Sequence, residues 1–211
     1  MEAKALLAAL FCAATAHAGA ADPPEIVQRT CVRCHGDNGV AAVPDTPHLD
    51  GQLASYLLDA LDKHQKGKLP TEVPDHVPAR LSLPELTAIA EFYAGSKASR
   101  PKQEADGQKV ARGEVVFRNR CEECHPDNGR EGDKDGPRLA AQNLPYMLKQ
   151  IRLFVSGKRK FGFLQDEAYK GLSDADLEAV AHFFAAQDQV APPQPKKKKR
   201  KKAEEPENPV K

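Results

Sequence analysis

Two short segments of this sequence share one pattern, in which two cysteines separated by two residues are followed directly by a histidine. They are Cys31–His35 and Cys121–His125. Two thiols at this spacing on one helical turn can bond to both vinyl groups of a haem, and the adjacent histidine can bind the iron. The segments are therefore predicted to hold covalent haem through Cys31, Cys34 and His35 and through Cys121, Cys124 and His125.

Other uses of a Cys-x-x-Cys pair explain the sequence less well. A thioredoxin-like dithiol lies in a strand–helix–strand context, which we do not find, and it gives no reason for a histidine at the same position twice. One zinc ion bound by all four thiolates leaves both histidines without a role. Covalent haem is the preferred interpretation, with these two as alternatives.

Residues 1–18 have the features of a secretory signal peptide. Lys4 gives a weakly positive start, residues 5–14 are apolar, and Ala16-His17-Ala18 is a small-x-small cleavage site. The apolar run is too short to span a bilayer. Cys12 lies within it, so the mature protein is expected to contain only the four motif cysteines and no disulfide. A periplasmic location is expected, because bacteria attach haem covalently outside the cytoplasm.

The chain repeats itself at an offset of 90 residues, so that Cys31 aligns with Cys121. Further identical pairs are Pro47 and Pro137, Leu49 and Leu139, Gln52 and Gln142, Tyr56 and Tyr146, and, after one inserted residue, Ser82 and Ser173. A duplication over nearly the whole mature chain predicts two similar domains. We place them at residues 22–98 and 108–190, joined by a polar, proline-containing linker at 99–107.

The spacing of apolar residues predicts three helices in each domain and no strands. The first helix carries the haem motif and covers residues 24–35 in one copy and 108–125 in the other. A middle helix follows, and a last helix begins at a capping serine, Ser82 or Ser173. The fold class is therefore all-α, with each small core completed by the haem.

These features resemble a diheme cytochrome c of the cytochrome c4 type, with two class I cytochrome c domains in tandem. The resemblance covers about residues 24–188 and includes the Cys-x-x-Cys-His-Gly motif at 31–36 and the Pro-x-Leu-x-Gly-Gln loop at 47–52. It implies two covalently bound haem c groups. It also implies that four side chains lie near the haem propionates, although ordinary helix packing explains them equally well: Gln52, Tyr56, Gln142 and Tyr146.

Class I domains usually place a methionine opposite the proximal histidine, in the loop before the last helix. Neither residues 68–81 nor residues 158–172 contain one. In the first loop, His76 lies near the position of the missing ligand, so we predict bis-histidine ligation by His35 and His76; a solvated loop histidine is the alternative. His64 on the middle helix and His48 in a surface loop are weaker candidates.

The second loop offers neither histidine nor methionine. Its candidate ligands are Lys158, Lys160 and Tyr169, while His182 on the last helix and Met147 on the middle helix are expected to have structural roles. The second iron is therefore expected to be five-coordinate, water-bound or bound by lysine. An open position permits small-ligand binding or chemistry, and a relay haem with an unusual ligand is the simpler alternative.

Residues 191–211 differ in composition from the rest of the chain. They include Lys196–Lys202, seven consecutive basic residues, in a segment of eight Lys or Arg and three Glu, whereas the whole chain has a net charge of +1. No packed element is expected there. Such a tail either stays solvated or binds an anionic membrane surface or an acidic partner. It resembles a nuclear localisation signal, but an exported protein has no use for one, and no nucleic-acid partner is expected.

Taken together, the sequence predicts an electron-transfer protein. Two haems in neighbouring domains pass single electrons between redox partners in the periplasm or at the membrane, and their ligands set their potentials. One alternative is an enzyme with a catalytic second haem, either peroxidase-like or sulfur-oxidising. Another is the cytochrome subunit of a dehydrogenase complex. No acid–base pair is convincingly placed over the second haem, which favours electron transfer.

Overall fold

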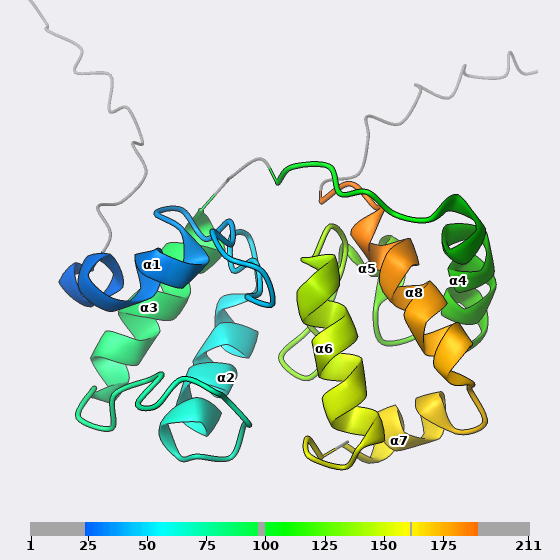
Figure 1. Cartoon of the computed structure of the whole chain (residues 1–211). Coiled ribbons are helices and arrows are strands. Elements are labelled where there is room, and N and C mark those ends of the chain that lie inside the picture. Colours follow the sequence, from blue (N-terminus) through cyan, green and yellow to red (C-terminus); the bar gives the residue numbers. More distant parts are fainter. Residues whose placement is uncertain (1–23, 97–99, 161, 190–211) are drawn as a thin grey trace, which may run out of the picture.

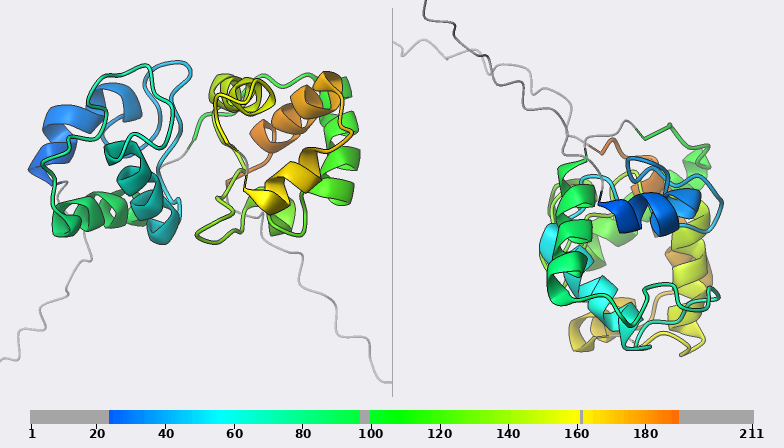
Figure 2. Two further views of the ribbon diagram at one scale, coloured as in Figure 1. Left: turned by 90° about the horizontal axis from the view of Figure 1, so that it is seen from below. Right: turned by 90° about the vertical axis from the view of Figure 1, so that its left-hand side faces the viewer.

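A computed structural model describes residues 24–96, 100–160 and 162–189 of the chain (Figure 1). These residues form helices and loops without strands, which confirms the all-α prediction, and the helices fall into two groups that lie side by side. Figure 2 shows the same separation from two further directions. No helix in these ranges is both long and apolar enough to cross a membrane. The expected signal peptide (1–18) and Lys-rich tail (191–211) lie outside the described residues.

Domain 1 contains a π-helical stretch, η1 (Val27–Cys31), which continues into α1 (Val32–His35), followed by α2 (Ala54–Gln65) and α3 (Leu83–Gly95). Helices α2 and α3 pack against each other. Buried apolar side chains from these elements and from the loop before α3 form one core: Val27, Leu57, Val77, Leu81, Leu86, Ile89, Ala90 and Tyr93.

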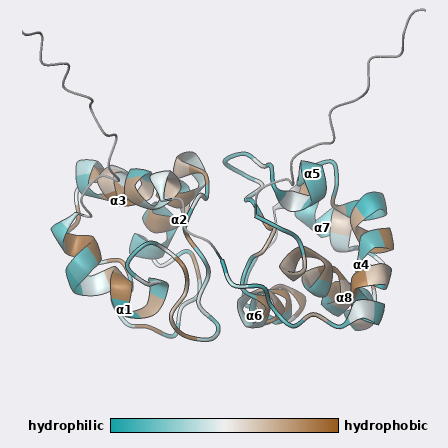
Figure 3. Cartoon of the chain, turned by 90° about the horizontal axis from the view of Figure 1, so that it is seen from above, coloured by the Kyte–Doolittle hydropathy of each residue, from teal (hydrophilic) through white to brown (hydrophobic). Residues whose placement is uncertain are grey.

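Domain 2 contains α4 (Gly107–Arg120), α5 (Pro126–Gly129), α6 (Leu144–Val155), α7 (Phe163–Tyr169) and α8 (Asp174–Ala185). Helices α4 and α8 make the most extensive contact of the molecule. The second core consists of Val116, Phe117, Leu144, Met147, Val180, Ala181, Phe183, Phe184 and Ala185. In both domains the hydrophobic residues are concentrated on the helices (Figure 3). Met147 lies in this core, as expected. The limits of the two domains remain a prediction.

Two features of domain 2 differ from the sequence prediction. The predicted first helix runs to His125, but α4 ends at Arg120 and the haem motif forms a turn. At the end of the motif, Pro126 disfavours the helical conformation of the preceding residue, and His125 has φ −128° and ψ 62°. The predicted loop at 158–172 contains the additional helix α7.

The serine caps of the last helices are confirmed. The backbone N–H of Ser82 donates to the Glu85 carboxylate at 2.8 Å, and that of Ser173 donates to the Asp176 carboxylate at 3.0 Å. These capping boxes satisfy amide groups that have no partner within the helix. They fix where α3 and α8 begin, and therefore where the preceding loop must end.

Gly113 allows α4 to approach α8 closely. A Cβ atom at this position would lie 2.1 Å from the carbonyl oxygen of Ala179, so Gly113→Ala forces the helices apart. We expect domain 2 to lose about 1–3 kcal/mol of stability, as for other overpacked contacts, and the guanidinium midpoint measured by circular dichroism to fall. Gly107→Ala is the matched control, because its Cβ would meet nothing within 4 Å. Equal losses in both variants would contradict this explanation.

Candidate haem sites and the interface between them

Each predicted proximal histidine is held by a hydrogen bond to a proline carbonyl. Nδ1 of His35 donates to the Pro47 oxygen at 3.1 Å, and Nδ1 of His125 donates to the Pro137 oxygen at 2.9 Å. A carbonyl oxygen can only accept, so Nδ1 carries the proton and Nε2 keeps its lone pair available for a metal ion. Such a bond also fixes the ring orientation of a metal-binding histidine.

Burial keeps both of these imidazoles neutral. The His35 side chain is 7% exposed, and desolvation lowers its pKa to about 4 although the bond to Pro47 acts in the opposite direction. Desolvation also lowers the pKa of His125. A neutral ring is the form of histidine that binds metal ions.

The four motif cysteines form no disulfide with one another, and Cys124 is the most exposed of them. Burial raises the pKa of Cys31, and it raises the pKa of Cys121 to about 11. A redox-active dithiol requires a thiol with a lowered pKa, so the first cysteine of each pair does not suit the dithiol alternative. Among the residues that the structure describes, the thiols do not come together as a single metal site.

In domain 1, the structure brings His76 from the loop before α3 to the ring of His35. The two ring centroids are 6.0 Å apart and the ring planes differ by 23°. Burial lowers the pKa of His76. Its Nδ1 atom is buried and has no hydrogen-bond partner in the described part of the chain. His76 is therefore a neutral side chain that faces the proximal histidine, as the sequence suggested.

His64 is closer to this site than its sequence context suggested. Its ring centroid lies 4.7 Å from that of His76, in an edge-to-face arrangement, and burial lowers the pKa of His64 to about 4. The sequence contained a sign of this placement. His64 aligns with Phe154 of the second repeat, and an apolar residue on an amphipathic helix marks the face that points into the core. Phe154 is indeed buried.

The corresponding part of domain 2 is built differently. Among the described residues of the 158–172 loop, a ring contact joins Tyr169 of α7 to Phe154, with centroids 6.1 Å apart. Burial and, to a smaller extent, the nearby Cys121 raise the pKa of Tyr169 to about 12. The guanidinium of Arg159 lies 4.6 Å from the centre of the Phe154 ring. Phe154, the residue equivalent to His64, thus contacts the tyrosine of α7, whereas His64 contacts His76 of the loop before α3.

Three other candidate ligands of domain 2 have structural or solvent-exposed positions. Nδ1 of His182 accepts a hydrogen bond from the backbone N–H of Asp106 at 3.2 Å, at the beginning of α4. Lys158 and Lys160 are both exposed. The expectation that His182 has a structural role is therefore confirmed.

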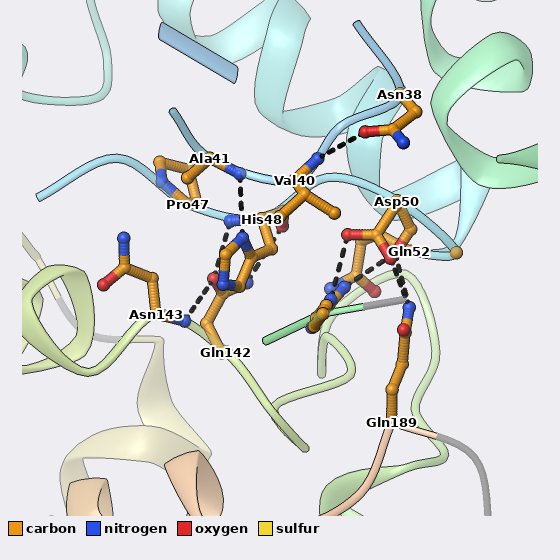
Figure 4. A network of polar contacts seen from close by, with 12 residues as sticks. Asn38, Val40, Ala41, Pro47, His48, Asp50, Gln52, Gln142, Asn143 and Gln189 are labelled. Atoms are coloured by element: carbon orange, nitrogen blue, oxygen red, sulfur yellow. Dashed lines mark hydrogen bonds and ion pairs between the residues drawn. The ribbon is translucent and has the colours of Figure 1, made fainter. Parts of the chain in front are cut away.

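The two domains meet through a reciprocal pair of glutamines (Figure 4). The Gln142 side chain accepts a bond from the His48 N–H at 2.7 Å and donates to the His48 carbonyl at 3.0 Å. The Gln52 side chain makes the same two bonds to Arg138, at 3.0 and 2.9 Å. Since Gln52 is equivalent to Gln142 and His48 to Arg138, the interface has approximate two-fold symmetry. His48 directly follows Pro47, which binds His35, and Arg138 directly follows Pro137, which binds His125. Each glutamine therefore binds next to the proline that holds the proximal histidine of the other domain.

The interface corrects one sequence expectation. His48 was assigned to a surface loop, but its side chain is buried, 5% exposed, because domain 2 covers that loop. Its Nδ1 atom accepts the backbone N–H of Ala41 at 2.9 Å. Burial lowers the pKa of His48 to about 4. His48 therefore has a structural role at the contact between the domains.

The side chains of each site suit covalently bound haem. Paired thiols precede an imidazole whose Nε2 lone pair is available. In domain 1, the buried Nδ1 of His76 has no hydrogen-bond partner among the described residues, and the His76 ring lies beside this imidazole. Soft thiols and neutral imidazoles are the donors by which proteins hold haem and its iron.

Comparisons with known proteins give consistent matches. Residues 108–184 match the family described as cytochrome C oxidase, cbb3-type, subunit III. The chain is 32% identical over 196 residues to the thiosulfate dehydrogenase electron acceptor of Thiomonas intermedia (strain K12), covering 87% of this chain and 88% of that protein. It is 31% identical over 192 residues to cytochrome c4 of Pseudomonas aeruginosa, covering 84% and 94% of the two chains.

A solved structure has a similar fold. The crystal structure of reduced recombinant cytochrome c4 from Pseudomonas stutzeri superimposes with a TM-score of 0.64 at 28% sequence identity. The superposition covers 74% of this chain and 93% of that one. The likeness therefore extends over most of both chains.

Proposed function

Because this chain belongs to the cytochrome c4 family of diheme cytochromes, we propose that it carries single electrons between redox protein partners in the periplasm or at the membrane. The family identifies an electron-transfer protein with two covalently bound haem c groups in tandem class I cytochrome c domains, as the sequence predicted. These groups supply one Fe(III)/Fe(II) couple each. The observation that carries the proposal is the interface, where a glutamine of each domain holds the loop beside the other domain's proximal histidine.

Haem attachment is assigned to the two motifs: Cys31, Cys34 and His35 in domain 1, and Cys121, Cys124 and His125 in domain 2. The support is the hydrogen bonding of the two histidines. Each Nδ1 proton is held by a proline carbonyl, at 3.1 Å for His35 and 2.9 Å for His125, so each ring can bind a metal ion only through Nε2. His35 and His125 are accordingly the proximal ligands.

His76 is assigned as the second axial ligand in domain 1. Imidazole nitrogens lie about 2 Å from a metal ion, so two rings on opposite sides of one ion have centroids about 6 Å apart. The separation of His35 and His76 is 6.0 Å, with nearly parallel ring planes. Burial keeps both rings neutral. Ligation by two histidines sets a different potential from ligation by histidine and methionine.

The distal side of domain 2 is assigned an open or unusual ligation. Support comes from Phe154, the residue equivalent to His64, which contacts Tyr169 where His64 contacts His76. Because a phenylalanine ring has no donor atom and Tyr169 has a raised pKa, this pair binds iron less readily than two histidines. The two domains therefore hold haems of unequal potential, which gives electron flow a direction.

A dehydrogenase that oxidises a sulfur compound is the electron donor that we favour. The relative from Thiomonas is named a thiosulfate dehydrogenase electron acceptor, and it matches 87% of this chain. The alternative of a sulfur-oxidising enzyme has less support, since that relative is named as the electron acceptor of the dehydrogenase. The Lys-rich segment Lys196–Lys202, outside those residues, is assigned to an acidic partner or an anionic membrane surface because of its charge.

Reduction by thiosulfate tests both the role and the donor. We expect the oxidised holoprotein to stay oxidised with thiosulfate alone and to take up two electrons per chain when a catalytic amount of thiosulfate dehydrogenase is added. The measurement is the rise of the reduced haem α-band, with dithionite reduction as the full-scale control. Reduction by thiosulfate alone would favour the enzyme alternative, and no reduction in the complete mixture would exclude this donor.

A further inference from the structure

The two-fold symmetry of the interface is broken at one pair of equivalent positions, residues 50 and 140. The first is an aspartate and the second is an alanine. The Asp50 side chain is 0% exposed. A carboxylate that is removed from water needs charged or hydrogen-bonding partners where it lies, whereas the glutamine contacts do not depend on any charge. Asp50 therefore has a role that symmetry does not explain.

Arg100, in the segment that connects the domains, is the counter-charge. Its side chain is 3% exposed. Nε donates to Oδ1 of Asp50 at 2.9 Å, Nη2 donates to the Asp50 carbonyl at 2.6 Å, and Nη1 donates to the Ala140 carbonyl at 3.1 Å. The guanidinium is planar and its donors point in fixed directions. All three bonds form together only when the loop of domain 1 that contains Asp50 and the loop of domain 2 that contains Ala140 have one particular relative position.

Gln189, near the end of the described part of domain 2, completes the cluster. Its Nε2 atom lies 2.6 Å from Oδ2 of Asp50 and 3.1 Å from the Asp50 carbonyl oxygen. Figure 4 shows Gln189 extending toward Asp50 from the other domain. Asp50 is thus bound from two segments that are far apart in sequence, the linker and the residues after α8.

Burial opposes the charges of this cluster. It raises the pKa of Asp50 although Arg100 and Gln189 act in the opposite direction, and it lowers the pKa of Arg100 although Asp50 acts in the opposite direction. A buried ion pair of this kind contributes little net stability, but breaking it by removing one partner is costly. Polar interfaces between domains of one chain usually permit relative motion. The Asp50–Arg100 ion pair therefore suits a role in selecting one arrangement of the two domains.

We infer that Asp50, Arg100 and Gln189 lock the two domains in one orientation, and that Asp50 and Arg100 are positioning residues for electron transfer between the haems. This inference rests on the proposed function, because it concerns electrons that pass between the domains. Without the lock, the glutamine contacts hold the domains together less rigidly, so the separation of the two sites varies and transfer slows.

The test compares the full-length holoprotein with Arg100→Gln. Pulse radiolysis gives the rate at which an added electron redistributes between the haems, and small-angle X-ray scattering gives the spread of domain arrangements. We expect the rate to fall at least fivefold and the radius of gyration to increase, with both reduction potentials unchanged. Asp50→Ala, which copies residue 140, should have the same effects.

Lys149→Gln is the matched control. Lys149 bonds to Glu72 across the interface at 2.8 Å, but the Glu72 side chain is 81% exposed. An exposed ion pair contributes little, so the rate should stay within twofold of the unaltered protein. A fivefold loss in this variant as well would overturn the assignment of the lock to the buried cluster.

Several results would overturn the inference. One is an unchanged rate of electron redistribution in Arg100→Gln, and another is a slower rate with an unchanged radius of gyration. A third is a shift in either reduction potential, since the substitution would then act at a haem. If Arg100→Gln does not accumulate with both haems, the double variant Asp50→Ala/Arg100→Gln, which leaves no unpaired buried charge, is judged by the same criteria. If the unaltered protein shows no redistribution, the proposed function fails, and the scattering comparison still decides the lock.

Discussion

Replacing His76 by alanine is expected to add one high-spin haem per chain. The reason is that the ring centroid of His76 lies 6.0 Å from that of His35, and residues 68–81 contain no other histidine and no methionine or cysteine. The measurement is the EPR spectrum of the oxidised holoprotein, together with its cyanide binding. In the unaltered protein we expect cyanide to bind only at the second haem, and in the variant at both.

The matched control for this prediction is His64→Phe, which introduces the residue found at the equivalent position of domain 2. His64 contacts His76 at 4.7 Å but does not face His35 directly, so the first haem should remain low-spin. Added imidazole should restore the low-spin signal of His76→Ala, which separates ligand loss from misfolding. A low-spin first haem in His76→Ala, combined with a high-spin one in His64→Phe, would reassign the ligand to His64.

Replacing both Cys121 and Cys124 by serine is expected to halve the covalently bound haem. The thiols of domain 2 would be lost, while Cys31 and Cys34 still serve domain 1. The pyridine haemochrome assay after acid–acetone extraction should therefore fall from two haems per chain to one. The core of domain 2 should also lose stability, because a small helical domain depends on the apolar area of its bound group.

Two other variants make this result specific. Cys12→Ser, in the predicted signal peptide, should leave two covalent haems per chain, because Cys12 is not part of either motif. Cys31→Ser/Cys34→Ser should also give one haem, but it should destabilise domain 1 and leave domain 2 intact. Two extraction-resistant haems in the Cys121/Cys124 variant would overturn the assignment of these cysteines.

Features that depend on local chemistry were accessible from the sequence. Ser82 and Ser173 predicted where the last helices begin, because a capping box is a short-range pattern. The position of His76 followed from its place in a loop that the fold brings over the proximal histidine. The non-helical conformation of His125 was also predictable in principle, since Pro126 stands in the sequence directly after the motif.

Features that depend on the contact between domains were not accessible in this way. His48 appeared to be a surface residue because its loop is polar and exposed in a domain considered alone, yet domain 2 buries it. The repeat alignment paired Gln52 with Gln142 but gave no sign that each binds the opposite domain. The one visible clue was the exchange of an aspartate at position 50 for an alanine at position 140.

The reciprocal glutamine contacts have an evolutionary consequence. An interface in which both partners use the same residues is the form that two identical subunits adopt in a symmetric homodimer. Fusing two such subunits replaces a concentration-dependent encounter by an effective concentration on the order of mM. The equivalent positions are then free to diverge, as Asp50 and Ala140 have done, and as His64 and Phe154 have done. A fused chain can therefore acquire two unlike redox centres, which a homodimer of identical subunits cannot.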